Sequence, residues 1–309
     1  MRLFEDKFKE SLKSNVVLLD RIMYYIIKRK GKQIRPMFVF LTCRMFGEIT
    51  EKSYRSASLI ELLHTATLIH DDVVDESLTR RGKESIQAKW DNAHGVLVGD
   101  FVYSKAFQLM ASFDNPEIIR ILADSTNRIS EGEVLQLSLK QKEILSKEKY
   151  FEIIDRKTAE LFKAAAATAG TLASCTKNEL ISLTNFSIAL GMNFQIKDDL
   201  LDYFGDEELT GKKIGKDFEE GKFTLPLIIA LPLMSKKDSS MVLETLFQNK
   251  KPDFKYIVKI IKETGAIEKV EDICNQFSET CFKELDNFPQ SDYKKGLIDI
   301  VENINARVS

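Results

Sequence analysis

The sequence predicts an all-α fold, a single-domain helical bundle of residues 1–309 around a central cavity. Apolar residues recur at the three- and four-residue spacing of helices along most of the chain. Alternating strand patterns are essentially absent. The 14 glycines and 6 prolines are few for 309 residues, and they gather between the helical segments. These observations together favour one helical domain without a linker.

The first half of the chain shows five helical patterns, each bounded by a local signal. Residues 4–30 are amphipathic and end near Gly31, and Pro36 suits the first turn of the next helix, which runs to about residue 46. Apolar positions at helical spacing predict a helix over 53–76. The segment 94–113 is apolar almost all round, which predicts a buried central helix. An Asp-Asn-Pro turn then leads into 116–139.

The second half continues in the same way. Ser146 is a good N-cap for a helix over 147–173, whose KAAAATAG tract permits close packing, and 178–204 follows as a mostly buried helix. A glycine- and lysine-rich loop covers 205–222. The further helices that the pattern predicts are 223–235, 238–248, 253–264, 266–285 and 291–306.

Composition places the chain among soluble globular proteins, with 44% hydrophobic and 30% charged residues. A net charge of −2 offers no field for nucleic acid or an anionic membrane surface, so we expect cationic binding to be local and no nucleic-acid partner. The four cysteines lack metal-type spacing and are expected to be reduced thiols. We find no signal peptide and no run of the ~20 apolar residues that span a bilayer, so we expect a cytoplasmic protein.

Residues 61–82 follow a helical apolar pattern and end in a cluster of charged residues. Asp71 and Asp75 are four residues apart and project from one helix face, with Asp72 a third of a turn away. Carboxylates crowded into one turn repel each other unless a cation bridges them, and Mg²⁺ prefers one or two carboxylates together with substrate phosphates. Arg80 and Arg81 follow as forked donors for a phosphate. Taken alone, the motif is more often a solvated helix end.

A second copy changes that balance. Residues 194–202 repeat the pattern, with Asp198 and Asp202 four apart, Asp199 beside the first, and Gln195 one turn earlier. Aspartates beside a buried helix face are costly unless they are paired or bind a metal. We therefore expect the two acidic helices to face each other across a cavity that holds metal ions and a polyphosphate.

With both clusters placed, the chain resembles the trans-type isoprenyl (polyprenyl) diphosphate synthases, and within them a long-chain, octaprenyl-type member. The resemblance covers nearly the whole length and rests on five motifs in the family's order: GKQIRP at 31–36, HTATLIHDDVVD at 64–75, RRG at 80–82, RKT at 156–158, and FQIKDDLLD followed by GKDFEEGKFTLPLI. It implies the isoprenoid synthase-type helical fold. It also implies a Mg²⁺-dependent prenyltransferase that joins an allylic diphosphate to isopentenyl diphosphate, repeatedly and head to tail, and releases pyrophosphate.

The resemblance also assigns roles to residues. Three Mg²⁺ ions are expected on Asp71, Asp72, Asp75, Asp198 and Asp202, and Asp199, Lys157 and Lys222 complete the catalytic set. The allylic diphosphate is expected on Arg80, Lys157, Lys212 and Lys222, helped by Thr158 and Gln195, and isopentenyl diphosphate on Lys32, Arg35, His64 and Arg81. Without the family, Lys32 and Arg35 are a solvated helix start and His64 is a core imidazole.

The chain departs from the family pattern at three places. Lys30 and Gln33 replace a glycine and an arginine of the first motif, while Lys32 and Arg35 are kept. Either Lys212 or Lys213 could be the diphosphate ligand, and we prefer Lys212 because it directly follows Gly211. The extended DDxxxxD variant of the first acidic motif is absent. No histidine or glutamate is clearly placed to take the final proton, and the family assigns that step to the departing pyrophosphate.

Product length should depend on the side chains that line the path of the growing chain. In the family these lie four, five and eight residues before the first aspartate, which here gives Thr67, Ala66 and Leu63, with Phe107 at the floor. Small Ala66 and Thr67 predict growth beyond fifteen carbons, within C30–C50 and best fitting C40. A short-chain farnesyl or geranylgeranyl synthase is the first alternative; a class I terpene cyclase and a non-catalytic subunit are weaker ones.

The resemblance further implies a homodimer and a product that is handed to a membrane, serving a respiratory quinone side chain. A helical scaffold with fortuitous acidic residues is the remaining alternative, and the paired motifs argue against it. Incorporation of labelled isopentenyl diphosphate separates a synthase from a cyclase.

Overall fold

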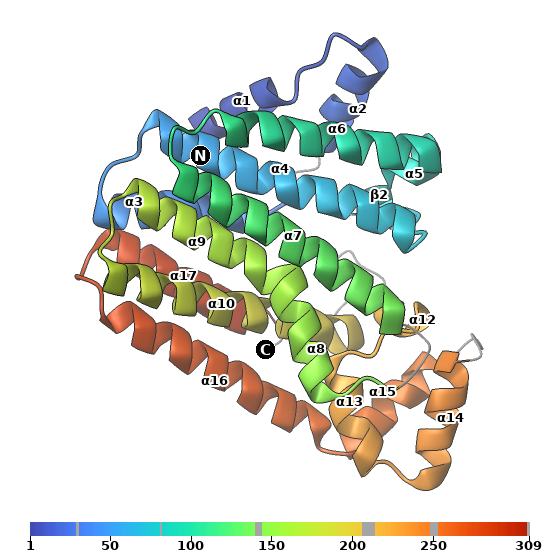
Figure 1. Cartoon of the computed structure of the whole chain (residues 1–309). Coiled ribbons are helices and arrows are strands. Elements are labelled where there is room, and N and C mark those ends of the chain that lie inside the picture. Colours follow the sequence, from blue (N-terminus) through green and yellow to red (C-terminus); the bar gives the residue numbers. More distant parts are fainter. Residues whose placement is uncertain (29–30, 81, 140–143, 206–213, 248–252, 308–309) are drawn as a thin grey trace. The chain divides into compact units, whose positions relative to one another are not determined.

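The computed structural model describes residues 1–28, 31–80, 82–139, 144–205, 214–247 and 253–307 (Figure 1). Nearly all of these residues lie in helices or in the turns between them. The strands among the described residues are β1 (Thr79–Arg80) and β2 (Lys83–Glu84), an antiparallel pair in which Thr79 lies opposite Glu84. The all-α fold predicted from the sequence is confirmed.

Contacts divide the chain into two compact units, and each is described by itself. Unit 1 comprises Met1–Thr126, Leu161–Thr184 and Phe288–Leu297, and unit 2 comprises Asn127–Glu160, Asn185–Asn287 and Ile298–Ser309. The expectation of a single domain stays a prediction. No helix within the described ranges is both long enough and apolar enough to cross a membrane.

Unit 1 is built on helix α4 (Glu51–Val74), and α6 (Asn92–Ala111) lies beside it (Figure 1). Two glycines of α6 allow this close packing. A Cβ atom on Gly99 would lie 2.1 Å from His70 Nε2, and one on Gly95 would lie 2.4 Å from Val73 Cγ2. The other helices that begin in unit 1 are α1 (Arg2–Ser11), α2 (Val17–Ile27), α3 (Ile34–Phe46), α5 (Ile86–Lys89), α7 (Pro116–Leu139), α9 (Glu160–Leu172, from its second residue), α10 (Lys177–Phe204) and α17 (Asp292–Asn305).

Two expectations for unit 1 need correction. The helix expected over 4–30 is broken between α1 and α2, where Ser14 Oγ accepts a hydrogen bond from the Val16 N–H at 3.1 Å and competes with helical bonding. The helix expected to be buried all round, α6, buries only one face. Val96, Leu97 and Phe107 on its other side are 44%, 64% and 47% exposed.

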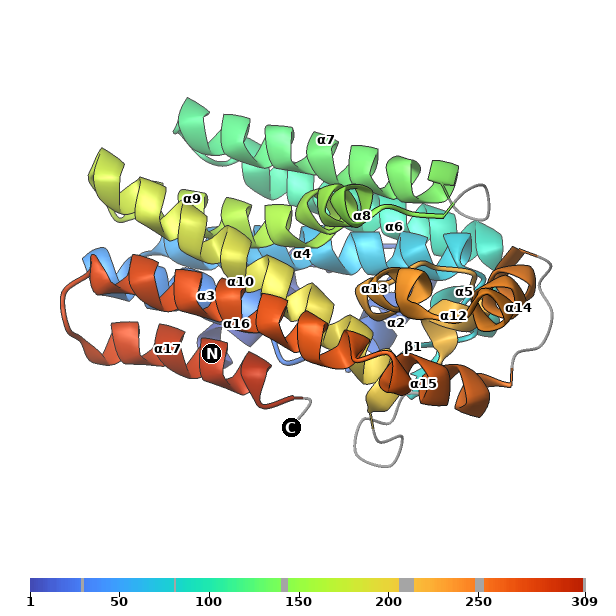
Figure 2. The same ribbon diagram turned by 90° about the horizontal axis from the view of Figure 1, so that it is seen from below.

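Unit 2 has a core of its own, built between α10 and the helices that follow it. Residues 185–204 of α10 run alongside α16 (Ala266–Asp286), and Asn193 Nδ2 donates to Ser278 Oγ at 3.0 Å (Figure 2). The remaining elements are α8 (Lys147–Ile154), η1 (Asp155–Ala159), α12 (Lys216–Glu219), α13 (Leu225–Ala230), η2 (Leu231–Leu233), α14 (Lys236–Phe247) and α15 (Phe254–Glu263).

A single π-helical turn, η1, interrupts the helix expected over 147–173. Its N-terminal end is as predicted, because Ser146 Oγ caps α8 by accepting the Lys149 N–H at 3.2 Å. Single π-helical turns inside α-helices are rare and frequently occur at functional sites. This one carries Lys157 and Thr158, two of the residues expected to bind substrate.

Candidate active site

The first acidic cluster lies at the C-terminal end of α4. The Asp75 N–H donates to the Asp71 carbonyl at 2.8 Å, so helical hydrogen bonding extends to Asp75, the C-cap residue of α4, and the two residues share a face. Both side chains are half-buried. Because unpaired carbonyls make this end of a helix negative, carboxylates here are unfavourable without a cation. Asp71 and Asp75 are therefore suited to a hydrated divalent ion.

Asp72, between them in sequence, turns into the protein and is 4% exposed. Its Oδ1 accepts from Arg80 Nε at 2.8 Å and from Nη2 at 2.6 Å, a forked contact. Burial alone would lower the pKa of Arg80, but Asp72 first, and then the charges of Asp71 and Asp75, raise it above its usual value. Gln87, from α5, donates to the carbonyls of Asp72 and Ser77 and holds this end of α4 in place.

Two residues expected to bind isopentenyl diphosphate lie together in unit 1. Arg35 Nη1 lies 3.4 Å from His64 Nε2, and because arginine can only donate, this nitrogen acts as the acceptor. The Arg35 guanidinium also lies over the ring of Phe162, 4.4 Å from its centroid. Lys32 is exposed just before α3, and Gln33 begins that helix with a left-handed φ of 49°. Within the basic first motif, Arg35 is thus fixed by contacts with His64 and Phe162, whereas the Lys32 side chain is exposed.

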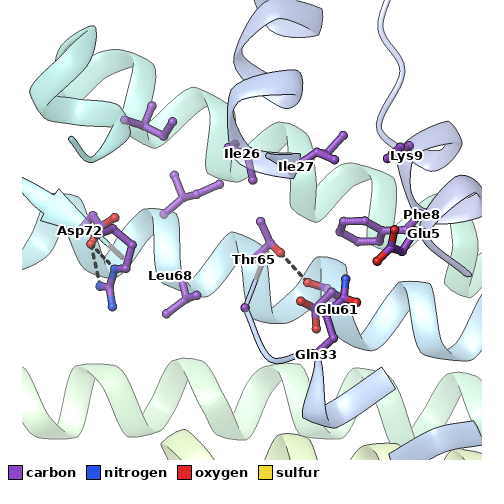
Figure 3. Close-up of a pocket in the computed structure, with 14 residues that line it drawn as sticks. Glu5, Phe8, Lys9, Ile26, Ile27, Gln33, Glu61, Thr65, Leu68 and Asp72 are labelled. Atoms are coloured by element: carbon purple, nitrogen blue, oxygen red, sulfur yellow. Dashed lines mark hydrogen bonds and ion pairs between the residues drawn. The ribbon is translucent and has the colours of Figure 1, made fainter. Parts of the chain in front are cut away.

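Unit 1 also contains an open cleft of about 750 Å³ between α4 and the N-terminal helices (Figure 3). Thr65, Leu68 and Asp72 face it from α4, while Ile26 and Ile27 come from α2 and Phe8 from α1. Its remaining lining residues are Glu5, Lys9, Gly31, Gln33, Glu61, Ile69, Arg80 and Ile86. The cleft is apolar along its middle and has Asp72 and Arg80 at one end.

The residues expected to set product length lie on a different face of α4. Leu63 is 3% exposed and Ala66 is fully buried, and neither lines the cleft. The Thr67 hydroxyl donates to the His64 carbonyl at 3.0 Å. Phe107, expected at the floor of the path, is 47% exposed on α6, so unit 1 does not enclose it.

The second acidic cluster lies in the last two turns of α10, again at the negative end of a helix. Asp198 is half-buried, and its Oδ1 accepts from Arg307 Nη1 at 3.1 Å. The Arg307 guanidinium also lies 4.6 Å from the centroid of the Phe194 ring. A cation from the C-terminal end of the chain therefore already contacts the first carboxylate of the cluster.

Asp199 is the buried member of the second cluster, at 2% exposure. Tyr150 Oη donates to its Oδ2 at 2.5 Å, and Gln195 Nε2 donates to its Oδ1 at 2.8 Å. Burial, followed by the charge of Asp217, raises the pKa of Asp199 to about 8, while the two hydrogen bonds act in the opposite direction. Burial also raises the pKa of Tyr150 well above its usual value, so this hydroxyl keeps its proton.

Asp202 organises the segment that follows α10. Its Oδ1 accepts the N–H of Lys216 at 3.2 Å and its Oδ2 accepts the N–H of Asp217 at 3.1 Å, at the start of α12. Its carbonyl accepts the Gly215 N–H at 2.7 Å. Because the side chain remains half-buried, its oxygens combine this backbone role with access to a cation.

The π-helical turn brings Lys157 and Thr158 to different partners in unit 2. Lys157 Nζ donates to Glu133 Oε2 at 2.5 Å and to Gln136 Oε1 at 3.0 Å, both from α7. The Thr158 hydroxyl donates to Gln195 Oε1 at 2.8 Å. Lys157 is thus held by an anionic side chain, and Thr158 is tied to the helix of the second acidic cluster.

Lys222 pairs with Glu220 at 2.7 Å and lies 3.9 Å from Asp217 Oδ1. Arg81, Lys212 and Lys213 lie outside the described residues, so the choice between the two lysines stays open.

Among the contacting residues that the sequence did not indicate are Tyr150, Glu133 and Arg307. Each lies far along the chain from the motif residue that it contacts, and no local pattern marks it. The one available signal was weak, since Tyr150 lies two helical turns before Thr158.

The donors fit a hard divalent ion. Asp71, Asp75, Asp198 and Asp202 are half-buried carboxylates, whereas Asp72 and Asp199 are buried and bonded to protein groups. Across the described part of the chain, no three histidine, cysteine or acidic side chains form a ready-made metal cage. Mg²⁺ does not need one, because it binds through one or two carboxylates together with water and substrate phosphates.

Comparisons with known proteins cover almost the whole chain. A family model described as Polyprenyl synthetase matches residues 16–263. The octaprenyl diphosphate synthase of Escherichia coli (strain K12) is 39% identical over 292 residues, which are 94% of this chain and 90% of that protein. The all-trans-nonaprenyl-diphosphate synthase (geranyl-diphosphate specific) of Rhodobacter capsulatus is 35% identical over 298 residues, which cover 96% and 91%.

Solved structures give the same result. A polyprenyl synthase from Caulobacter crescentus CB15, complexed with calcium and isoprenyl diphosphate, superposes with a TM-score of 0.95 at 33% identity and covers 100% of this chain and 95% of its own. A decaprenyl diphosphate synthase from Rhodobacter capsulatus gives a TM-score of 0.94 at 32% identity, covering 100% and 96%.

Proposed function

Because this chain belongs to the polyprenyl synthetase family, and so is a trans-prenyltransferase, we propose that it makes a long-chain all-trans polyprenyl diphosphate. It condenses an allylic diphosphate with isopentenyl diphosphate, repeatedly and head to tail, and releases pyrophosphate at each step. The observation that carries the proposal is the pair of DDxxD motifs on α4 and α10, each with its outer carboxylates half-buried.

The outer carboxylates, Asp71 and Asp75 in one motif and Asp198 and Asp202 in the other, would hold Mg²⁺ ions, which we propose to number three, and these ions would bind the allylic diphosphate. Bound divalent ions would neutralise the charge that develops on the leaving pyrophosphate. The ion on a crystallised relative, the Caulobacter polyprenyl synthase, is calcium. Arg80, whose raised pKa keeps it charged, supplies forked donors beside the first motif.

Lys157 and Lys222 contribute further positive charge to the same diphosphate, together with Lys212. Both described lysines are held by glutamates, Lys157 by Glu133 and Lys222 by Glu220. A diphosphate carries more negative charge than one carboxylate, so each ammonium can exchange its glutamate for phosphate oxygens.

Isopentenyl diphosphate binds the basic residues of the first motif, Lys32 and Arg35, with His64 and Arg81. The contact of Arg35 with His64 supports this, because it leaves the guanidinium beside an acceptor that fixes its direction. Arg35 lies over Phe162 and is 9% exposed, and charge-assisted bonds to phosphate are strong where water is largely excluded.

Octaprenyl (C40) is the product length that we propose. The octaprenyl synthase relative at 39% identity supports it, as do the small side chains at Ala66 and Thr67. Each CH₂ that is buried contributes roughly 0.8 kcal/mol, so a long product leaves slowly and suits transfer to a membrane. We propose that this product supplies the side chain of a respiratory quinone. The exposed apolar residues of α6 support a homodimer, because a second copy of the chain could cover them. We also propose that the protein is cytoplasmic.

The test is incorporation of labelled isopentenyl diphosphate by purified protein in Mg²⁺, followed by chromatography of the dephosphorylated products. Asp71→Ala and Asp198→Ala should each reduce turnover by orders of magnitude, and chelation of the metal should abolish it reversibly. Asp124→Ala is the matched control, since this helical aspartate is 68% exposed and its ion pair with Arg120 is long, at 3.9 Å. Near-normal activity of either motif variant would refute the assignment, and C15 or C20 products would favour the short-chain alternative.

A further inference from the structure

Four side chains in unit 2 form one continuous line of hydrogen bonds across three elements. Tyr150 Oη of α8 donates to Asp199 Oδ2 at 2.5 Å, and Gln195 Nε2 of α10 donates to Asp199 Oδ1 at 2.8 Å. The Thr158 hydroxyl of η1 then donates to Gln195 Oε1 at 2.8 Å. The line therefore runs from a tyrosine outside every family-like motif to a residue of the RKT motif.

Three of the four members are buried and Gln195 is half-buried, so water has limited access to replace a missing member. Tyr150 is 3% exposed, Asp199 2% and Thr158 7%. In such surroundings the loss of one partner leaves the other polar group unsatisfied, and the remaining bonds must rearrange. A change at Tyr150 can therefore reach Thr158, although the two side chains share no bond.

Asp199 differs in this respect from the other acids of its motif. Side chains donate to both of its oxygens and it is almost fully buried, whereas Asp202 accepts from backbone N–H groups, Asp198 accepts from Arg307, and both of these acids are half-buried. Its place in the DDxxD motif is thus that of a link between Tyr150 and Gln195, while the two outer aspartates stay half-buried.

We propose that Tyr150 is a positioning residue that fixes the Asp199 carboxyl, and through it the amide of Gln195 and the hydroxyl of Thr158. The inference rests on the proposed function, in which Gln195 and Thr158 serve the allylic diphosphate. The Tyr150 hydroxyl occupies Oδ2 and leaves Oδ1 as the acceptor for the Gln195 NH₂ group. Tyr150 thus fixes the rotation of the carboxyl, and because Oδ1 accepts the NH₂ end of the amide, the amide oxygen of Gln195 is left for the Thr158 hydroxyl.

Removal of the Tyr150 hydroxyl frees both ends of this arrangement. Asp199 can rotate towards another donor, and Gln195 then loses the contact that orders its amide. A displaced amide moves the oxygen that accepts the Thr158 hydroxyl, so Thr158 loses its fixed direction. The ring itself stays in place, since it packs against Phe151 with the centroids 5.6 Å apart and needs no hydroxyl to do so.

The first experiment compares Tyr150→Phe with Tyr203→Phe. Tyr203 is an equally buried tyrosine of unit 2, 1% exposed, whose hydroxyl is not part of the line. We expect Tyr150→Phe to lower kcat by about tenfold with an unchanged KM for isopentenyl diphosphate, because misplacement by ~1 Å near the reacting groups can cost up to about a hundredfold. Tyr203→Phe should stay within about twofold. Replacement of Tyr150 by 3-fluorotyrosine, which keeps the hydroxyl, should restore kcat.

The second experiment asks whether Tyr150 acts through Thr158. In a Thr158→Val background, Tyr150→Phe should cost less than twofold, because the group that it positions is already gone. Losses that multiply in the double variant would overturn the proposal, and so would equal activity of the two tyrosine variants.

A third measurement needs neither turnover nor a stable Tyr150→Phe protein. Mn²⁺ binding, followed by calorimetry, should weaken at least tenfold in Asp198→Asn but stay within about threefold in Asp199→Asn. Loss of Mn²⁺ binding in Asp199→Asn would make Asp199 a metal ligand and would end its role as a link. The wild-type assay keeps the two proposals apart: a wild type that incorporates no isopentenyl diphosphate refutes the function, whereas an active wild type with an indifferent Tyr150→Phe refutes only the positioning role.

Discussion

Gly132 of α7 is the residue whose replacement tests most directly how the π-helical turn is held. A Cβ atom at this position would lie 2.7 Å from Arg156 Cβ and 3.2 Å from the Lys157 backbone nitrogen. Neither atom is the end of a flexible side chain. Because carbon atoms normally approach to about 3.5 Å, the Gly132→Ala variant must push the turn away by roughly 0.8 Å.

Two effects on stability oppose each other in Gly132→Ala. Replacing a glycine inside a helix stabilises by roughly 0.5–1 kcal/mol, whereas overpacking costs about 1–3 kcal/mol. The difference predicts a net loss of about 1 kcal/mol in the free energy of unfolding. The effect on turnover should be larger, because Lys157 and Thr158 sit on the displaced turn. A shift of nearly 1 Å predicts a loss of kcat/KM of about 10- to 100-fold.

The assay is labelled isopentenyl diphosphate incorporation, paired with urea unfolding of the same preparations. Gly296→Ala is the matched control, because the atoms nearest to a Cβ atom on this helical glycine belong to the side chain of Leu41, the closest at 2.9 Å, and its methyl groups can move aside. It should keep its activity and lose less than 1 kcal/mol. A Gly132→Ala protein with full activity and unchanged stability would refute the reasoning that α7 sets the position of the turn.

Three further predictions concern other parts of the chain. Ser174 has a left-handed φ of 58° in the turn after α9, so Ser174→Gly should stabilise by about 0.5–1 kcal/mol in urea unfolding, and a lower stability would contradict it. Arg307 donates to Asp198 Oδ1 at 3.1 Å, so Arg307→Leu should raise Mn²⁺ affinity several-fold in calorimetry; unchanged or weaker binding would mean that this contact does not compete with the metal. Ala66→Tyr should shorten the products seen by chromatography, whereas Leu68→Tyr, on the cleft face of α4, should not, and the reverse result would place the growing chain in the cleft.

Helices were predictable from the sequence where one face carries a regular apolar stripe. The pattern over 116–139 coincides with α7, and the Ser146 N-cap is as predicted. The break between α1 and α2 was missed because apolar spacing continues through it, while a single serine-to-backbone bond redirects the chain. The one-sided burial of α6 was missed for a related reason. The sequence shows that a helix face is apolar, but it does not show whether another part of the chain covers that face.

The site was predictable in residue type but not in the partners of each side chain. Spacing alone put Asp71 and Asp75 on one face, and the Asp75 N–H bond to the Asp71 carbonyl agrees with it. Spacing gave no sign that Lys157 would meet Glu133, because the two residues belong to different helices and Gly132 is what lets those helices approach. Such contacts depend on how helices pack, which a local pattern does not contain.

The two DDxxD motifs divide their acids in the same way, and helix geometry explains why. The first and fifth residues of the motif are four apart and share a face, whereas the second points about 100° away. When the shared face is open to a ligand, the second acid is directed towards the protein and needs a partner there. Asp72 finds Arg80 and Asp199 finds Tyr150, and both carboxylates are almost fully buried. The motif therefore places two half-buried carboxylates on one face and one buried carboxylate inside the protein, and the partner of the buried carboxylate is what differs between α4 and α10.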